Sequence, residues 1–117
     1  MFMAINSKKK GARAERKWAE FCREHGYEKV RRTAQFCGNT GEASDCVGLE
    51  GIHQECKAVE RLNIVEAMNQ AVRDSTKEGE GNLPIVAHKR NRTPWYVTML
   101  AEDWFKLYSA WKPPSQT

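Results

Sequence analysis

Two short β-type segments followed by an amphipathic helix constrain the fold of this chain more than any other feature of its sequence. Residues 44–49 and 52–58 have the length and composition of strands, and Glu50-Gly51 between them indicates a hairpin turn. Asn63 can then cap a helix in which apolar residues recur at helical spacing from Ile64 to Val72. A helix between this hairpin and a later strand predicts a crossover connection, and therefore a mixed sheet with helices packed on its faces.

The rest of the sequence supplies elements on both sides of this unit. Gly26 is a suitable end for a first helix, and Pro113-Pro114 would stop a last one. The remaining predicted elements are a helix over 8–25, a strand over 29–36, a loop over 37–41, strands over 83–88 and 95–100, and a helix over 102–111. The predicted order is αβββαββα, which belongs to the α/β class.

Length and composition indicate one domain over residues 1–117, with flexible ends at 1–7 and 113–117. No apolar run approaches the roughly 20 residues that cross a bilayer, so we expect no membrane span. The apolar residues 1–5 are too few for an export signal, and we therefore expect a cytoplasmic protein. The four cysteines fit no compact zinc pattern, and we expect reduced, mostly buried thiols. The four tryptophans are expected in the core or at a dimer interface.

Charge is distributed unevenly along the chain. The net charge is +4, but residues 1–32 carry +6, residues 33–80 carry −5 and residues 81–117 carry +3. If the ends fold to either side of the middle segment, basic surfaces would hold a polyanion by its phosphates while the acidic middle holds a cation. An ordinary solvated Lys/Arg surface explains the same pattern equally well.

The triplet Glu55-Cys56-Lys57 is the first candidate for chemistry. Side chains alternate along a strand, so Glu55 and Lys57 share one face while Cys56 points to the other. On its own, such a triplet is more often a simple charge pair.

Asp45 adds weight, because it lies on the preceding strand of the predicted hairpin. It lies directly opposite Glu55 if the loop is an odd-numbered one, such as 49–51 with Gly51 in the left-handed conformation, or if a bulge intervenes. A two-residue turn would place the two carboxylates on opposite faces. Facing carboxylates repel, so their proximity implies a bound divalent cation or a raised pKa.

Hard oxygen ligands of this kind favour Mg²⁺, for which Mn²⁺ can substitute, and both ions bind phosphate oxygens readily. The arrangement therefore predicts hydrolysis of a phosphodiester by metal-activated water. Lys57 could orient the attacking water or offset the charge that develops on phosphorus.

Four motifs together resemble the PD-(D/E)xK nuclease superfamily, and within it the small archaeal and phage-type Holliday junction resolvases. The motifs are Gly11-Ala12-Arg13-Ala14-Glu15-Arg16, Ser44-Asp45, Glu55-Cys56-Lys57 and Gln70-Ala71. The resemblance covers roughly residues 8 to 100, and the proline that usually precedes the aspartate is Ser44 here. It implies a restriction-endonuclease-like fold, a homodimer and cleavage of four-way DNA junctions, in the host cytoplasm if a phage encodes the chain.

The resemblance also implies residue roles. Asp45 and Glu55 would bind the metal with the Cys56 carbonyl, Glu15 would reach the same site from the first helix, and Gln70 would position Lys57 or the phosphate. Without the resemblance, Glu15 reads more simply as a helix-surface ion pair and Gln70 as a solvent-facing polar residue.

Basic residues at both ends of the chain are candidates for binding DNA through its phosphates. They are Lys8, Lys9, Lys10, Arg13, Arg31, Arg32, Lys89, Arg90 and Arg92. The run 8–10 could equally be a solvated tail. Two alternative functions stay open: a nicking, flap or mismatch endonuclease with the same chemistry, and a basic DNA-binding module without catalysis.

Overall fold

The computed structural model describes residues 7–33, 44–78 and 81–114. The elements are α1 (Ser7–Glu24), β1 (Arg31–Arg32), β2 (Cys46–Val47), β3 (Ile52–Lys57), α2 (Ile64–Glu78), β4 (Leu83–His88), β5 (Tyr96–Met99) and α3 (Ala101–Ala110). This order confirms the predicted αβββαββα arrangement. Among the described residues, no helix has both the length and the apolar character that crossing a bilayer requires.

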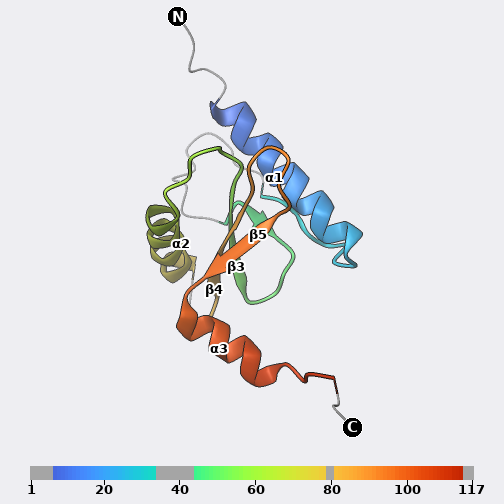
Figure 1. The fold of residues 1–117 in the computed structure, drawn as a ribbon, viewed down its shortest axis with the longest axis vertical. Helices are drawn as coiled ribbons and strands as arrows, with labels where there is room; N and C mark the ends of the chain where they lie inside the picture. Colours follow the sequence, from blue (N-terminus) through green and yellow to red (C-terminus); the bar gives the residue numbers. More distant parts are fainter. Residues whose placement is uncertain (1–6, 34–43, 79–80, 115–117) are drawn as a thin grey trace, which may run out of the picture.

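The five strands form one mixed sheet in the order β1-β2-β3-β4-β5. The pair β3–β4 is parallel, whereas the other three pairs are antiparallel. Helix α2 provides the crossover from β3 to β4, as predicted, and the sheet lies between α1 and α2 (Figure 1). The Asn63 side chain caps α2 by accepting a hydrogen bond of 3.1 Å from the Glu66 amide.

Each face of the central strands packs against a different helix. The face under α1 contains the larger core cluster, which includes Trp18, Cys22 and Cys56, while Ala67, Ala71 and Val86 form the cluster under α2. Strand alternation sends Gln54 and Cys56 toward α1 and sends His53 and Glu55 toward α2. Consistent with this division, the Trp18 indole N–H donates a 2.8 Å hydrogen bond to the Gln54 side chain.

The first two strands are shorter than predicted. The strand expected over 29–36 is β1, which begins only at Arg31, and its residues 34–36 lie outside the described part, as does the loop expected over 37–41. The strand expected over 44–49 is reduced to β2. Gly48 follows β2 with a φ of +110°, and its Cα lies so close to the segment before β1 that a Cβ would be 2.4 Å from the Lys29 carbonyl oxygen. This close approach replaces strand pairing beyond Val47.

The ends of the chain show smaller differences. Helix α1 already includes Ser7, which was expected in a flexible end, and the residues 1–6 and 115–117 lie outside the described part. Gly26 follows α1 with a φ of +98°, as expected for a helix stop. Three cysteines, Cys22, Cys46 and Cys56, are free and buried, in agreement with the expected reduced thiols.

Candidate active site

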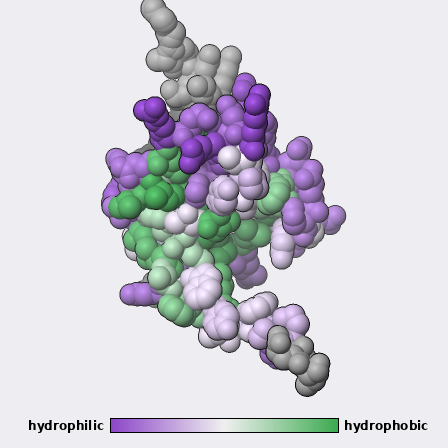
Figure 2. Space-filling view, viewed as in Figure 1, coloured by the Kyte–Doolittle hydropathy of each residue, from purple (hydrophilic) through white to green (hydrophobic). Residues whose placement is uncertain are grey.

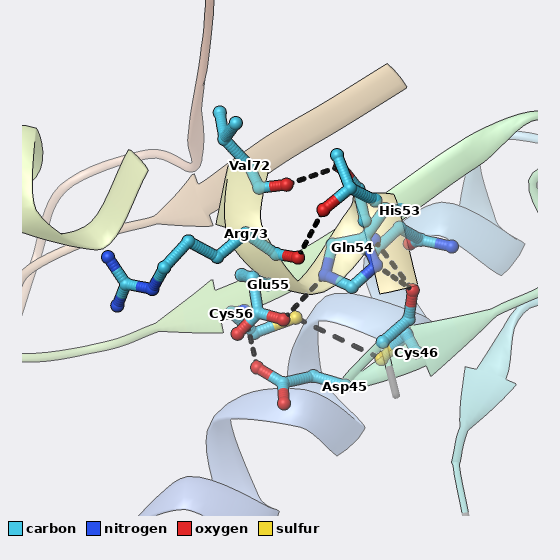
Figure 3. A network of polar contacts seen from close by, with 11 residues as sticks. Asp45, Cys46, His53, Gln54, Glu55, Cys56, Val72 and Arg73 are labelled. Carbon is cyan, nitrogen blue, oxygen red and sulfur yellow. Dashed lines mark hydrogen bonds and ion pairs between the residues drawn. The ribbon is translucent and has the colours of Figure 1, made fainter. Parts of the chain in front are cut away.

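Asp45 lies directly before β2 and bonds to β3 on either side of Glu55. Cys46, the first residue of β2, pairs with Gln54 of β3. Gly51 in the intervening turn has a φ of +83°, which confirms the predicted left-handed position. The Asp45 amide donates to the Gln54 carbonyl at 2.8 Å, and the Asp45 Oδ2 accepts a 2.8 Å hydrogen bond from the Cys56 amide. In Figure 3 the Asp45 carboxylate bonds to Cys56, while the Glu55 carboxylate points to the His53 ring.

The pKa of Asp45 reflects this crowding. Burial raises it first, and the neighbouring Glu55 and then Glu15 carboxylates raise it further, to about 7. The Cys56 amide and the Lys57 ammonium group act in the opposite direction. Of the five predicted catalytic residues, Glu15, Glu55 and Lys57 are therefore near enough to Asp45 to influence its charge, although the four come from α1, the residue before β2, and β3.

Glu15 reaches this cluster from α1. Its Oε1 pairs with the Arg32 guanidinium of β1 at 2.7 Å, and not with the basic residues that neighbour it on its own helix. Burial raises the pKa of Glu15, and the nearby Glu55 carboxylate raises it further. The Arg32 and Lys57 side chains lower it. Because Arg32 is held by Glu15, it lies at the edge of the acid cluster, which differs from the exposed phosphate contact that we expected.

The acids around Asp45 would favour a nearby cation. Burial, and then the Glu55 and Glu15 carboxylates, raise the pKa of Asp45, and a divalent cation would relieve the repulsion among these acids. Among the described residues, however, the ligand atoms of Glu15, Asp45 and Glu55 do not all lie within 4.8 Å of one another, so the three would have to move closer to share one ion. The Cys56 side chain does not belong to this set, because its Sγ lies 3.9 Å from Cys46 Sγ in the core and its pKa is raised by that contact and by burial. Its carbonyl remains a predicted ligand.

A buried polar chain supports Glu55 from behind. Ser44 Oγ accepts from the Gln54 amide at 3.2 Å and lies 2.9 Å from His53 Nδ1, while His53 Nε2 lies 2.7 Å from Glu55 Oε2. All four residues are buried, His53 and Gln54 completely. Figure 3 shows the His53 ring between the two strands with Glu55 beside it.

Asp74 of α2 joins this chain. Ligand atoms of His53, Glu55 and Asp74 all lie within 4.8 Å of one another, so these buried residues could hold a metal ion. The Asp74 Oδ2 is buried without a hydrogen-bond partner among the described residues. Neither His53 nor Asp74 was among the predicted site residues. Strand alternation could have identified His53, because it places His53 on the same face as Glu55 and Lys57. No pattern in the sequence indicates that Asp74 of α2 lies near them.

Predicted DNA-binding residues from the two basic ends meet in one groove. The groove has a volume of about 630 Å³, and its basic lining residues are Arg13, Lys17, Lys89, Arg90 and Arg92. Lys17 was not among the predicted residues. The groove borders the acid cluster, because its lining residues Ala14 and Ala58 directly adjoin Glu15 and Lys57. Figure 2 shows hydrophilic side chains over this end of the molecule.

The remaining predicted catalytic and DNA-binding residues are not among the described residues that line the groove or influence the charge of Asp45. Arg31 is exposed on β1, and Gln70 lies half-buried on α2, one turn before Asp74. The backbone of residues 8–10 is helical, but their side chains lie outside the described part. Trp95 belongs to the edge of the core, since its ring centroid is 5.2 Å from that of Trp18.

The sequence matches one known protein family. No curated protein matches the sequence. The family described as "Phage putative PDDEXK endonuclease" matches residues 6–116, which is nearly the whole chain. The motif for which that family is named agrees with the paired acids and the lysine that β2 and β3 bring together. The chain therefore belongs to this phage family of PD-(D/E)xK endonucleases.

Proposed function

We propose that this protein is a magnesium-dependent endonuclease that cuts branched DNA, with four-way junctions as its main substrate. The observation that carries the proposal is that Glu15, Asp45, Glu55 and Lys57 are near enough to influence one another's charge, beside a basic groove. A DNA-binding module without catalysis has no use for buried acids next to its phosphate-binding surface, because they repel the ligand and destabilise the fold.

Asp45 and Glu55 hold the cation in this proposal, with the Cys56 carbonyl and Glu15 as further ligands, and Mn²⁺ can replace Mg²⁺. When bound, the cation supplies positive charge to the scissile phosphate and lowers the pKa of water. Glu55 belongs to two groups, one with Asp45 and Glu15 and one with His53 and Asp74. We favour the group with Asp45 as the catalytic position. Asp45 and Lys57 are only half-buried, so DNA can approach them, whereas His53 and Asp74 are enclosed.

The protein's own groups then have separate tasks. The Lys57 ammonium group offsets negative charge that develops on phosphorus and helps to orient the attacking water. Arg32 holds the Glu15 carboxylate in place from β1. Gln70 positions Lys57 or the phosphate.

His53 and Ser44 position Glu55. The directed chain from the Gln54 amide through Ser44 and His53 fixes the Glu55 carboxylate, and such supporting contacts commonly contribute about 10- to 100-fold to metal affinity or activity. This gives a chemical reason for a serine where the superfamily usually has proline.

Ser44→Ala is therefore expected to raise the Mg²⁺ concentration needed for half-maximal cleavage by about tenfold. The measurement is a magnesium titration of cleavage under otherwise fixed conditions. Ser75→Ala is the matched control, because Ser75 is equally buried but its hydroxyl bonds only the Val72 carbonyl of its own helix. Equal magnesium requirements for the two variants would contradict a positioning role for Ser44.

The basic groove is expected to bind the DNA backbone. Arg90→Gln should weaken binding to branched and linear DNA alike, and should reduce the slope of log affinity against log salt by about 0.9. The measurement is fluorescence anisotropy with labelled DNA over a range of salt concentrations. Arg73→Gln removes an exposed arginine of α2 outside the groove, and it should leave the slope unchanged. An unchanged slope for Arg90→Gln would place the DNA elsewhere.

The decisive experiment compares a labelled four-way junction, linear duplex and single strand, each with Mg²⁺ and with EDTA. We expect paired symmetric nicks in the junction only, produced by a homodimer that offers one active site to each of two strands. Preferential cleavage of nicked, flapped or mismatched DNA would show that the enzyme has the proposed chemistry but a different main substrate. Binding without cleavage in any metal would overturn the catalytic proposal.

A further inference from the structure

Helix α3 exposes its apolar side and buries a polar residue. Asp103 is only 6% exposed, whereas Trp104, Phe105 and Tyr108 are 48%, 61% and 51% exposed. A surface helix of a monomer normally has the opposite arrangement, with the apolar side toward the core. Figure 1 shows α3 leaving the end of β5 and pointing away from the sheet.

The exposed apolar residues form a single band along α3, which we call the α3 stripe. It consists of Leu100, Trp104, Phe105, Leu107, Tyr108 and Trp111, between 41% and 61% exposed. Steps of three and four residues place most of them on one side of a helix. The rings also touch in sequence, since Trp104 stacks on Tyr108 with centroids 5.3 Å apart and Tyr108 contacts Trp111 at 5.9 Å. The stripe is thus already ordered without a partner.

The stripe is large for an apolar surface exposed on a single chain. An aromatic side chain offers roughly 150–250 Å², so half-exposed rings contribute about 100 Å² each. With the two leucines the stripe presents on the order of 500 Å² of apolar surface, close to the largest patches on ordinary monomers, which often have a function. Two copies of it would bury about 1,000 Å², which is the lower limit for a specific interface.

We propose that the α3 stripe binds the same stripe of a second copy of this chain. No residue of the stripe carries a charge, so it suits an apolar surface and not a phosphate backbone. A two-fold axis brings identical patches together, so one uncharged stripe is sufficient to form a closed dimer. The proposal deepens the proposed function and rests on it for the need for two active sites.

The position of the stripe agrees with such a dimer. In Figures 1 and 2, α3 lies at the end of the molecule opposite α1 and the hydrophilic surface of the basic groove. A dimer through α3 would therefore leave both active sites open to DNA. It would also account for Trp104 and Trp111, which are exposed in a single chain.

Sedimentation equilibrium of the full chain over a wide range of concentrations tests the proposal. We expect twice the mass of one chain for the unmodified protein, and at least about thirtyfold weaker association for Tyr108→Arg. Phe105→Arg is a second variant of the stripe and should have the same effect. Tyr27→Arg is the matched control, because Tyr27 is 58% exposed at the far end of α1, and it should associate normally. Circular dichroism verifies that each variant is folded.

Two results would overturn the proposal: a monomeric unmodified protein at all concentrations, or equal association of Tyr108→Arg and Tyr27→Arg. Cosedimentation of the monomer with anionic vesicles through α3 would also overturn it, in favour of a membrane partner. Cleavage of linear and branched DNA is measured on the same samples. A dimer that cuts no DNA would refute the nuclease proposal but not the proposed dimer interface. A monomer that nicks DNA would refute the dimer interface but not the nuclease proposal.

Discussion

Asp45→Asn is expected to abolish DNA cleavage and, at the same time, to stabilise the metal-free protein at alkaline pH. Loss of cleavage follows if Asp45 holds the cation, and we expect a reduction of at least about 100- to 1,000-fold. Stabilisation follows because the ionised Asp45 carboxylate is disfavoured, first by burial and then by its neighbours Glu55 and Glu15. An amide has nearly the same shape as the carboxylate but carries no charge that these neighbours can repel.

The sign of the pH dependence is opposite to that of an ordinary aspartate. The pKa of Asp45 is about 7 in the folded protein, against the ordinary value of 3.8 that applies when the chain is unfolded. The folded state therefore binds the proton more tightly. Asp45 costs the metal-free fold nothing below about pH 4, and its cost grows as the pH rises to about 7. Above that pH the cost is on the order of a few kcal/mol, which Asp45→Asn removes.

Thermal unfolding with EDTA and with Mg²⁺, at acidic and at alkaline pH, measures these effects. The unmodified protein should gain stability from Mg²⁺ chiefly at alkaline pH, and the variant should gain little at either pH. Asp103→Asn is the control, because Asp103 is a buried aspartate of α3 that does not contribute to the pKa shift of Asp45. An Asp45→Asn variant that still cuts DNA, or that melts earlier than the unmodified protein in EDTA at alkaline pH, would remove Asp45 from the metal site.

Gly48→Ala is expected to destabilise the fold by about 3 kcal/mol or more. Two costs combine at this position. A φ of +110° strains any residue with a Cβ, and that Cβ would lie 2.4–2.6 Å from backbone atoms of Lys29 and Val30. Backbone cannot move aside as a flexible side chain can, so β1 would separate from β2.

Gly51→Ala separates the two costs. Gly51 has a φ of +83°, but a Cβ there would meet nothing within 4 Å. It should therefore lose only about 1–2 kcal/mol, the cost of the left-handed conformation alone. Urea unfolding of both variants measures the difference. Equal losses would show that the contact between Gly48 and the Lys29–Val30 backbone contributes nothing to stability.

Local rules were sufficient to predict the elements and the central pairing. Alternation along β3 and the left-handed Gly51 predicted the hairpin and the two faces of β3, because both depend only on neighbours in the sequence. The crossover through α2 followed from the order of the elements. The boundaries of β1 and β2 were wrong because the approach of Gly48 to Lys29 joins segments that no local pattern connects.

The same distinction applies to the site. The alternative interpretation of Glu15, an ion pair on its own helix, named the wrong partner, because its carboxylate pairs with Arg32, 17 residues away. The proximity of Asp74 to His53 depends on how α2 is rotated against the sheet, which periodicity does not specify. The meeting of Arg13 with Arg90 and Arg92 was anticipated only as basic segments on either side of an acidic one, and Lys17 was overlooked.

Strand β3 interleaves two kinds of side chain, with Gln54 and Cys56 in the core beneath α1 and His53 and Glu55 beneath α2. A slip of one position would exchange the two sets between the faces, so that the polar set would enter the apolar cluster under α1. A misaligned chain would thus lose its chemistry and its stability in the same event. Folded but inactive molecules, which would compete with active copies for DNA, are therefore disfavoured.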